Sequence, residues 1–327
     1  MDLQGKVVLV TGGTGSFGQK FVRMALDLFN PRKVIVYSRD ELKQSVMMES
    51  YQQEERLRFF LGDVRDMQRL RRALDGVDYV VHAAALKQVP MGEYNPIEVI
   101  RTNIMGAAHL IDAAIDKGVE KVVALSTDKA ANPINLYGAT KLCADKLFVA
   151  GNSYVGARKT RFSIVRYGNV IGSRGSVIPL FKKVKENGGV IPITDKRMTR
   201  FWITLEQGVE LVMKAFERMH GGEIFVPKIP SMSVTDLADA VAPGCRHEYV
   251  GIRPGEKLHE VLVPADEGRH TVELDDMYVI VPSFKSWVDS NGWKDRGRCL
   301  PEGFCFASDN NPWRLSREEL KRMIDQA

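Results

Sequence analysis

Two short runs in this sequence bring together residue types that exchange protons. The run Ser126-Thr127-Asp128-Lys129 combines hydroxyl, carboxyl and amine groups, and Tyr137 and Lys141 follow it closely. Because Tyr137 and Lys141 are four residues apart, a helix would place them on the same face. A lysine ammonium near a tyrosine hydroxyl favours the phenolate, which can act as a base towards a substrate hydroxyl. A Tyr-x-x-x-Lys pair is common on amphipathic helices, so its meaning depends on the surrounding sequence.

A glycine-rich turn near the start of the chain supplies that context. The run Thr11-Gly12-Gly13-Thr14-Gly15-Ser16-Phe17-Gly18 directly follows the apolar residues Val7-Val8-Leu9-Val10. In a strand–turn–helix unit that binds a dinucleotide, Gly12 permits the tight turn, Gly15 lets the backbone approach the pyrophosphate, and Gly18 lets the helix pack on the strand. We therefore predict a dinucleotide cofactor rather than a purely structural turn. The residues of this turn that we expect to contact it are Gly12, Thr14, Gly15, Ser16, Phe17 and Gly18.

The residues after the second expected strand indicate which dinucleotide binds. Proteins that prefer NAD usually place Asp or Glu there to hold the ribose 2′-hydroxyl. This chain has Ser38-Arg39 instead, and a guanidinium beside a hydroxyl suits a 2′-phosphate, so we predict NADP. Asp40 comes next and leaves two alternatives open, a helix cap or a ribose contact. Asp63, after the third strand, could reach the adenine amino group, cap a helix, or do both.

Alternating strands and helices must position these groups. We expect strands near 6–11, 33–37, 57–61, 78–84, 121–126 and 162–167, with helical stretches such as 96–117 between them. This alternation predicts an α/β fold of the Rossmann type over residues 1–170, with a doubly wound parallel sheet covered on both faces. Residues 171–327 are expected to form mainly a smaller substrate-binding lobe, with some segments returning to the Rossmann domain. Helices should begin after Ser233 and Ser316.

Length and composition argue against several other classes of protein. A chain of 327 residues that is 44% hydrophobic can bury a large core, and a net charge of +5 without a concentrated basic tract argues against nucleic-acid binding. The first strand begins by Lys6, which leaves no room for a signal peptide, and the apolar runs are too short to span a membrane. The four cysteines lack ligand spacing, so we expect reduced thiols and no metal site. We expect a cytoplasmic protein.

Together these motifs resemble a known family. The sequence is similar to the extended short-chain dehydrogenases/reductases that act on nucleotide sugars, and more narrowly to the inverting UDP-N-acetylglucosamine 4,6-dehydratases of pseudaminic acid biosynthesis. The resemblance covers most of the chain and is weakest over 284–309. Besides the glycine turn and residues 126–141, it rests on the segments 37–43, 82–87, 93–96, 166–170, 172–176, 197–202 and 251–257.

The resemblance implies a reaction without net oxidation. Bound NADP takes hydride from C4 of UDP-N-acetylglucosamine while Tyr137 removes the proton of the 4-hydroxyl. The resulting 4-ketone acidifies the hydrogen on C5, a base removes it, and the C6 hydroxyl is protonated and leaves as water. Hydride then returns to C6 and a proton to C5. With inversion at C5 the product is UDP-2-acetamido-2,6-dideoxy-β-L-arabino-hex-4-ulose. This reaction is the first step of pseudaminic acid biosynthesis, which serves the modification of flagellin or surface glycans.

Asp128 and Lys129 occupy the acid and base positions of this scheme. Dehydratases that retain the configuration at C5 typically carry an Asp–Glu pair there, whereas this chain carries Asp128-Lys129. Asp128 would have to stay protonated, and Lys129 would need a lowered pKa to lose its proton; burial with the sugar favours both neutral forms. Inversion is inferred from the family, and Lys129 is its local correlate. The catalytic residues implied are Thr127, Asp128, Lys129, Tyr137 and Lys141.

The resemblance also implies binding residues. For the cofactor, beyond the glycine turn, these are Ser38, Arg39, Asp40, Leu42, Lys43, Asp63, Val64, Ala83, Ala84, Lys87, Tyr137, Lys141 and Val170. For the UDP-sugar they are Lys87, Asn169, Arg174, Arg200, Arg253 and Glu256. Plainer roles stay open: a solvated loop pair for Asp128 and Lys129, surface charges for Lys87, Arg200 and Arg253, a packed side chain for His82 and a backbone-bonding structural role for Asn103.

Two other functions remain as alternatives. A 4-epimerase or a retaining dehydratase on a UDP-sugar would use the same fold, although an epimerase needs only Tyr137, Lys141 and a hydroxyl. A non-catalytic NADP-sensing regulator would usually lose the Tyr-x-x-x-Lys pair, which this chain keeps. We also expect a homo-oligomer, a dimer or a larger assembly up to a hexamer, because the helices near 97–116 and 137–150 resemble those that form subunit contacts in this superfamily.

Overall fold

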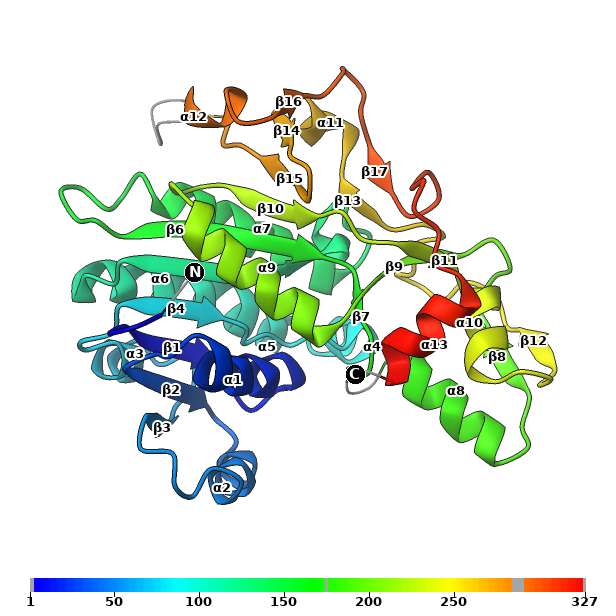
Figure 1. Cartoon of the computed structure of the whole chain (residues 1–327), viewed down its shortest axis with the longest axis horizontal. Coiled ribbons are helices and arrows are strands. Elements are labelled where there is room, and N and C mark those ends of the chain that lie inside the picture. Colours follow the sequence, from blue (N-terminus) through cyan, green and yellow to red (C-terminus); the bar gives the residue numbers. More distant parts are fainter. Residues whose placement is uncertain (1–2, 174–175, 284–290, 326–327) are drawn as a thin grey trace.

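A ten-stranded sheet forms the centre of the protein (Figure 1). The computed structural model describes residues 3–173, 176–283 and 291–325. The parallel part of the sheet has the order β3 (Leu57–Leu61), β2 (Lys33–Ser38), β1 (Val7–Thr11), β4 (Tyr79–His82), β5 (Lys121–Thr127), β6 (Arg161–Tyr167) and β10 (Ile224–Pro227). It continues antiparallel through β15 (Met277–Ile280), β14 (Thr271–Glu273) and β16 (Arg298–Cys299). The predicted α/β fold of the Rossmann type is confirmed.

The six predicted strands are all present, with ends within two residues of those expected. The apolar run of β1 is buried throughout, because helices cover the sheet on both faces. In the register of the sheet, Val10 lies opposite Val36 on one side and Val81 on the other. Strand order reverses between β1 and β4, so the chain segments that leave these two strands diverge and open the crevice where such sheets bind ligands.

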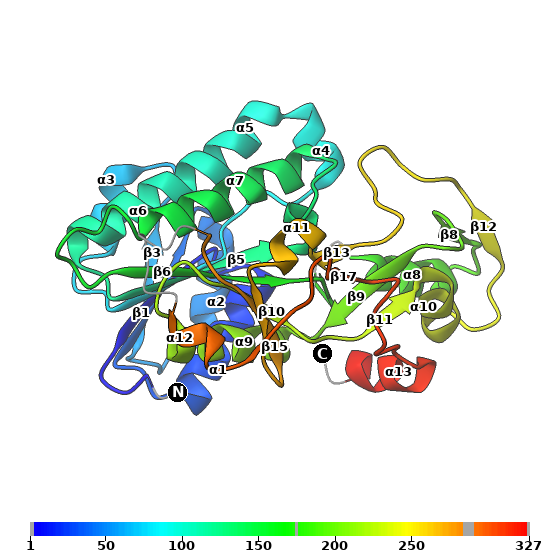
Figure 2. The same cartoon turned by 90° about the horizontal axis from the view of Figure 1, so that it is seen from above.

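Helices cover the two faces of the sheet unequally (Figures 1 and 2). One face carries α1 (Ser16–Leu28) and α9 (Leu205–Arg218), with α2 (Glu41–Glu49) near the β3 edge. The other face carries α3 (Met67–Ala73), α4 (Val89–Tyr94), α5 (Pro96–Ile100), α6 (Gly106–Lys117) and α7 (Leu136–Gly151). Over the described ranges, none of the helices has both the length and the apolar character required to cross a bilayer.

The helix expected over 96–117 is interrupted. Between α5 and α6 the chain forms a π-helical turn, η1 (Arg101–Met105), which contains the buried Asn103. The Asn103 amide accepts a hydrogen bond from the Leu86 backbone N–H (2.9 Å) and donates to the Leu86 carbonyl oxygen (3.0 Å). Its amide also donates to Thr140 Oγ1 (3.0 Å), on α7. The widened turn thus ties the segment after β4 to α7, which is the structural role expected for Asn103.

The second half of the chain builds a smaller lobe with its own core. Its strands are β7 (Asn169–Val170), β9 (Thr199–Ile203) and β11 (Ser231–Ser233) in one sheet, β8 (Ile191–Ile193) with β12 (His247–Tyr249), and β13 (Val261–Val263) with β17 (Phe306–Ala307). Its helices are α8 (Val177–Glu186), α10 (Val234–Val241) and α13 (Arg317–Asp325), with short turns α11 (Ala265–Gly268) and α12 (Asn291–Lys294) nearer the main sheet. Buried side chains such as Phe181, Trp202 and Leu320 fill this second core.

The predicted helix starts in the lobe are confirmed. Ser233 caps α10 by accepting a hydrogen bond from the Asp236 backbone N–H (3.0 Å). Ser316 and Glu319 bond reciprocally to each other's backbone N–H at the start of α13. Because β10, β14, β15 and β16 come from residues beyond 170 and lie in the main sheet, the chain crosses between the two cores several times. The division into domains at residue 170 stays a prediction.

Candidate active site

The glycine turn after β1 is shaped by close backbone contacts. Gly12 has a φ of +66°, and a Cβ there would stand 2.9 Å from the Ala84 backbone nitrogen. A Cβ on Gly18 would stand 2.5 Å from Gly13 Cα, so the helix α1 packs directly on the turn, as expected. Gly15 precedes α1 in an extended conformation, and none of the described side chains caps this helix. The N-terminal turn of α1 is therefore suited to an anionic pyrophosphate.

The end of β2 presents Ser38 and Arg39 beside this turn. The Ser38 hydroxyl accepts hydrogen bonds from Thr14 Oγ1 (3.2 Å) and Gln44 Nε2 (3.2 Å). The Arg39 side chain is 54% exposed, and its Nη1 lies 3.8 Å from Asp63 Oδ2. Asp40 caps α2, because its Oδ1 accepts a hydrogen bond from the Lys43 backbone N–H (3.0 Å). Of the two alternatives for Asp40, the structure therefore shows the helix cap.

Asp63 is not a helix cap. That part belongs to Asp66, which accepts a hydrogen bond from the Arg69 backbone N–H (2.9 Å) at the start of α3. The Asp63 carboxylate instead binds Arg65, through the backbone N–H (3.0 Å) and the guanidinium (2.7 Å). Burial alone would raise the pKa of Asp63, but these hydrogen bonds outweigh it and lower the pKa. The capping alternative is corrected here, and the adenine contact stays a prediction.

Other residues expected at the cofactor differ in how they are placed. Phe17 stacks on Phe21 with ring centroids 6.2 Å apart, so its side chain belongs to the packing of α1. Val64 is 5% exposed and packs against Gly106. Any cofactor contact of the buried Val64 would therefore come from its backbone. Leu42 is exposed on α2, as is Lys43, which pairs with Asp40. Ala83 and Ala84 follow β4 beside the glycine turn, and Val170 lies in β7.

The start of α7 sits tightly against the end of β5. Asn135 caps the helix by accepting a hydrogen bond from the Gly138 backbone N–H (2.7 Å), and its amide donates to the Gly255 carbonyl oxygen (2.8 Å). A Cβ on Gly138 would stand only 2.1 Å from the Lys129 carbonyl oxygen. Glycine is therefore required there, and it brings Tyr137 close to Lys129.

The protonation of Tyr137 differs from the sequence expectation. Lys141 Nζ donates a hydrogen bond to the Leu125 carbonyl oxygen (2.7 Å), which directs its ammonium to the end of β5. Burial raises the pKa of Tyr137 to about 12, and the ammonium of Lys129 opposes this effect. In the protein alone, Tyr137 is a neutral phenol. The expected help of Lys141 and of the nicotinamide charge to the phenolate stays a prediction.

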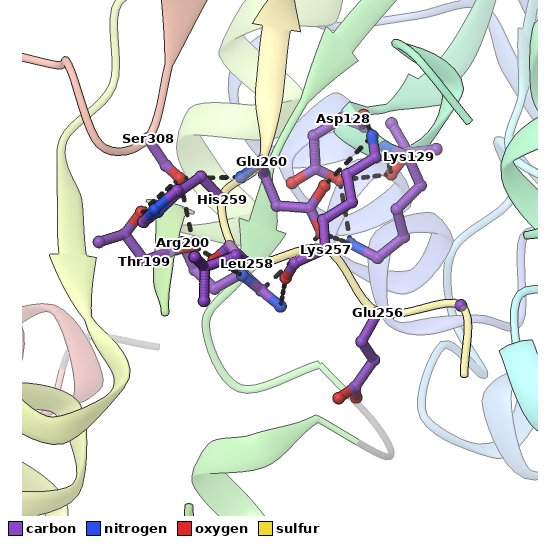
Figure 3. A network of polar contacts seen from close by, with 12 residues as sticks. Asp128, Lys129, Thr199, Arg200, Glu256, Lys257, Leu258, His259, Glu260 and Ser308 are labelled. Carbon is purple, nitrogen blue, oxygen red and sulfur yellow. Dashed lines mark hydrogen bonds and ion pairs between the residues drawn. The ribbon is translucent and has the colours of Figure 1, made fainter. Parts of the chain in front are cut away.

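Asp128 and Lys129 lie in a buried cluster of charges (Figure 3). They form the 3₁₀ turn η2 (Asp128–Ala130) after β5, which Thr127 caps. Asp128 is fully buried, and its Oδ1 accepts hydrogen bonds from Thr127 Oγ1 (2.9 Å) and Lys129 Nζ (3.0 Å). Lys129 Nζ also lies 3.3 Å from Glu260 Oε1. The solvated loop pair is thereby excluded for Asp128 and Lys129.

Glu260 and Lys257 complete the cluster and were not identified from the sequence. Glu260 directly precedes β13, and its side chain is 3% exposed. Lys257 Nζ lies 3.7 Å from Glu260 Oε2 and donates a hydrogen bond to the Ala131 carbonyl oxygen. The signal in the sequence was a carboxylate immediately before the apolar run 261–263, three residues after a lysine of a recognised segment.

These carboxylates reverse the expected protonation of Lys129. Burial alone would lower the pKa of Lys129, but Asp128 and Glu260 outweigh it and raise the pKa. Lys129 is therefore an ammonium in the protein alone, and the lowered pKa expected from burial is wrong for this state. The physical reason is the pair of carboxylates, first Asp128 and then Glu260, and sequence reasoning did not include the second of them.

Arg200 is buried and is bound by backbone carbonyl groups. Its Nη1 donates to the carbonyl oxygens of Thr199 (2.7 Å) and Leu258 (3.1 Å), and its Nη2 to that of Lys257 (2.9 Å). Its Nε lies 3.8 Å from Glu260 Oε1. The buried guanidinium is thus held by protein groups and is not a surface charge. Its expected contact with the pyrophosphate stays a prediction.

The remaining substrate candidates lie around the cluster. Asn169 Oδ1 and Glu256 Oε2 are buried and have no hydrogen-bond partner among the described residues. Figure 3 shows Glu256 turned away from the charge cluster, and Arg253 Nη1 lies 3.9 Å from Glu256 Oε1. Lys87 is exposed, and its pKa is lowered first by desolvation of its amine and then by the Lys129 ammonium; its contact with cofactor or substrate stays a prediction. Arg174 lies outside the described residues.

His82 has the packed role that was one of its alternatives. It is 2% exposed on β4, and its Nδ1 shares a hydrogen bond with Thr11 Oγ1 (2.8 Å). Burial, assisted by the Lys141 ammonium, lowers the pKa of His82 to about 3. The imidazole is therefore neutral at physiological pH.

Comparison with known proteins identifies the family. The model of the polysaccharide biosynthesis protein family matches residues 8–282. The chain belongs to this family. It is 54% identical to an inverting UDP-N-acetylglucosamine 4,6-dehydratase of Campylobacter jejuni, over 98% of this chain and 97% of that enzyme. The resemblance predicted from the sequence is thus confirmed. A UDP-glucose 4-epimerase of Rickettsia conorii is 42% identical over 98% of this chain and 95% of the epimerase.

Solved structures support the same assignment. Pen from Bacillus thuringiensis superposes with a TM-score of 0.90 at 37% identity, and the match covers 100% of both chains. The dTDP-glucose 4,6-dehydratase DesIV of Streptomyces venezuelae, solved with NAD bound, has a TM-score of 0.69 at 27% identity. That match covers 77% of this chain and 86% of DesIV.

Proposed function

We propose that this protein is an enzyme that converts UDP-N-acetylglucosamine into a UDP-4-keto-6-deoxy-hexosamine with inversion at C5. The observation that carries the proposal is the Asp128–Lys129 pair, buried beside Tyr137 at the end of β5, in a chain 54% identical to an inverting dehydratase. An epimerase has no use for such an acid–base pair, because it breaks no C–O bond. The reaction would be the first step of pseudaminic acid biosynthesis.

The cofactor we propose is NADP. The glycine turn and the N-terminus of α1, which no described side chain caps, are suited to a pyrophosphate, and DesIV was solved with NAD bound. Ser38 and the half-exposed Arg39 support the 2′-phosphate, since Asp40 is engaged in capping α2. When bound, this group accepts a hydride from C4 of the sugar and returns a hydride at C6.

Tyr137 is proposed to take the proton of the 4-hydroxyl. The pKa of this phenol is high in the protein alone, so it needs nearby positive charge to act as a base. Lys129 supplies one such charge, and the oxidised nicotinamide ring would supply a second. Lys141 steadies the end of β5 through the Leu125 carbonyl oxygen.

Asp128 and Lys129 are proposed to carry out the elimination. At rest they form an ion pair across 3.0 Å, and transfer of one proton from Lys129 Nζ to Asp128 Oδ1 yields a carboxylic acid and a neutral amine. The amine then takes the C5 proton, while the acid protonates the C6 hydroxyl, which leaves as water. The C5–H and C6–O bonds break and a C5–C6 double bond forms, so protons and charge balance.

The product distinguishes this proposal from its rivals. The pure protein would be incubated with UDP-N-acetylglucosamine and the products read by NMR. We expect a 4-keto-6-deoxy sugar with inverted C5. A sugar that keeps its 6-hydroxyl and inverts only C4 would instead identify a 4-epimerase, the activity named for the 42% identical relative, and retained C5 would identify a retaining dehydratase. Unchanged substrate would favour a non-catalytic regulator.

We also propose that the protein forms a homo-oligomer through the α4–α5–α7 side of the molecule. Exposed apolar side chains gather on α4, α5 and the loop before α7: Met91, Tyr94, Ile97 and Ile134 are each more than half exposed. Apolar side chains on adjacent elements are typical of a subunit contact. Light scattering would measure whether the particle is a dimer or a larger assembly.

A further inference from the structure

Glu260 is a second buried carboxylate against Lys129. Its Oε1 lies 3.3 Å from Lys129 Nζ, and its Oε2 is buried without a hydrogen-bond partner among the described residues. The backbone of Glu260 is fixed on both sides by Ser308, whose hydroxyl accepts from the Glu260 N–H (2.9 Å) and whose N–H donates to the Glu260 carbonyl oxygen (2.8 Å). A buried carboxylate fixed beside an amine stabilises the charged form of that amine.

Three cations from three segments face this carboxylate. They are Lys129 on η2, Arg200 on β9 and Lys257 in the loop before β13. Arg200 Nε lies 3.8 Å from Oε1, and Lys257 Nζ lies 3.7 Å from Oε2. Glu260 therefore has two cationic neighbours besides Lys129.

We propose that Glu260 is a positioning residue for Lys129, which it orients and whose ammonium it stabilises as Lys129 takes the C5 proton. This inference rests on the proposed function. Asp128 cannot do the same work, because it must carry a proton at that moment in order to protonate the leaving hydroxyl. Glu260 therefore stands to Lys129 as the buried aspartate stands to the histidine of a Ser-His-Asp triad. The raised pKa of Lys129, to which Glu260 contributes, agrees with this assignment.

The test compares Glu260→Gln with Glu260→Asp in the full chain loaded with cofactor. Exchange of the C5 hydrogen in deuterated solvent would be measured across pH, and reduction of the bound cofactor by UDP-N-acetylglucosamine would be followed separately. In Glu260→Gln we expect C5 exchange to slow by about tenfold or more, because Lys129 becomes a weaker base. Its pH profile should also move to lower pH, because loss of a negative charge lowers the proton affinity of the Lys129–Asp128 pair. Reduction of the cofactor should stay within a few-fold of wild type.

Glu260→Asp keeps the charge, so its pH profile should stay close to that of wild type even if its rate falls. Glu223→Gln is a matched control, because Glu223 is also a buried, hydrogen-bonded glutamate but bonds to Ser163 and Trp293 away from Lys129. It should lower stability and leave the pH profile in place. A Glu260→Gln profile that superposes on wild type, or a fall in rate without a shift in pH, would overturn the inference. Absence of C5 exchange in the wild type would instead overturn the proposed function, and with it this role of Glu260.

Discussion

Replacing Lys129 with Met should separate the oxidation at C4 from the elimination that follows. Methionine has a similar length but no amine, so the change removes the base and preserves most of the volume. Loss of a positioned acid or base typically costs 10²–10⁴-fold in rate, and we expect product formation to fall by about that much. Hydride transfer from C4 should persist at a lower rate, because Tyr137 and the positive charge of the oxidised nicotinamide remain, whereas the Lys129 ammonium that also lowers the pKa of Tyr137 is lost.

The same change should also destabilise the protein. Removing one partner of a buried ion pair costs about 3–5 kcal/mol, because the other charge stays behind. Arg200 and Lys257 still face Glu260 in the variant, so the loss falls mainly on Asp128, which is fully buried. We therefore expect the lower end of that range, about 3 kcal/mol of unfolding free energy.

Absorbance of the reduced cofactor after mixing with UDP-N-acetylglucosamine measures the first half of the reaction, and NMR of the products measures the second. Lys129→Met should show the absorbance and release no dehydrated sugar, whereas Tyr137→Phe should show neither. Denaturant unfolding gives the loss of stability. If Lys129→Met turns over within a few-fold of wild type, Lys129 is not the base at C5 and the reasoning fails.

Three further predictions follow from other parts of the structure. Arg39→Ala should weaken the binding of NADP by about 1.5–3 kcal/mol, the contribution of a hydrogen bond to a charged group, and leave the binding of NAD unchanged. Calorimetry that finds equal affinity of the wild type for both cofactors would contradict the assignment. The pKa of His82 is about 3 in the folded protein, against an ordinary value of 6.5. Between these two pH values only the unfolded chain binds a proton at His82, so the free energy of unfolding falls as the pH drops below 6.5. At pH 5 the loss is about 2 kcal/mol of unfolding free energy. In denaturant unfolding, the difference in this free energy between pH 7.5 and pH 5 should be smaller by that amount in His82→Gln than in the wild type. An equal difference in both proteins would rule this out. Asn103→Ala leaves the Leu86 backbone N–H and carbonyl groups without their partner, so it should lower the free energy of unfolding by about 1–3 kcal/mol. The same unfolding experiment measures this loss, and a value within error of zero would show that the bonds to Leu86 are not needed.

The elements set by local pattern could be predicted from the sequence. Buried parallel strands appear in the sequence as continuous apolar runs. The glycine turn is recognisable because the backbone leaves no space for a Cβ at Gly12 or Gly18. Asp128 and Lys129 could be found for a similar reason, since they directly follow a strand whose carboxyl end faces the ligand. The π-helical turn at Asn103 could not be found, because it depends on a hydrogen bond to Leu86, on a different segment.

Protonation within the site depended on contacts that the sequence does not display. Lys129 and Glu260 are 131 positions apart, and only the folded chain brings them to 3.3 Å. Burial alone would lower the pKa of Lys129, but Asp128 and the distant Glu260 together raise it. Arg200 shows the same limitation, because the carbonyl oxygens of Lys257 and Leu258 that occupy its guanidinium come from a distant loop.

The missing side chain at Gly138 has a consequence for how this active site can change. Any residue other than glycine would bring a carbon to 2.1 Å from the Lys129 carbonyl oxygen, and the turn that carries Asp128 and Lys129 would have to retreat by about 1 Å. Tyr137, on α7, would then lie farther from Asp128 and Lys129, on η2. Selection for activity from a fully randomised codon at position 138 should therefore return glycine alone.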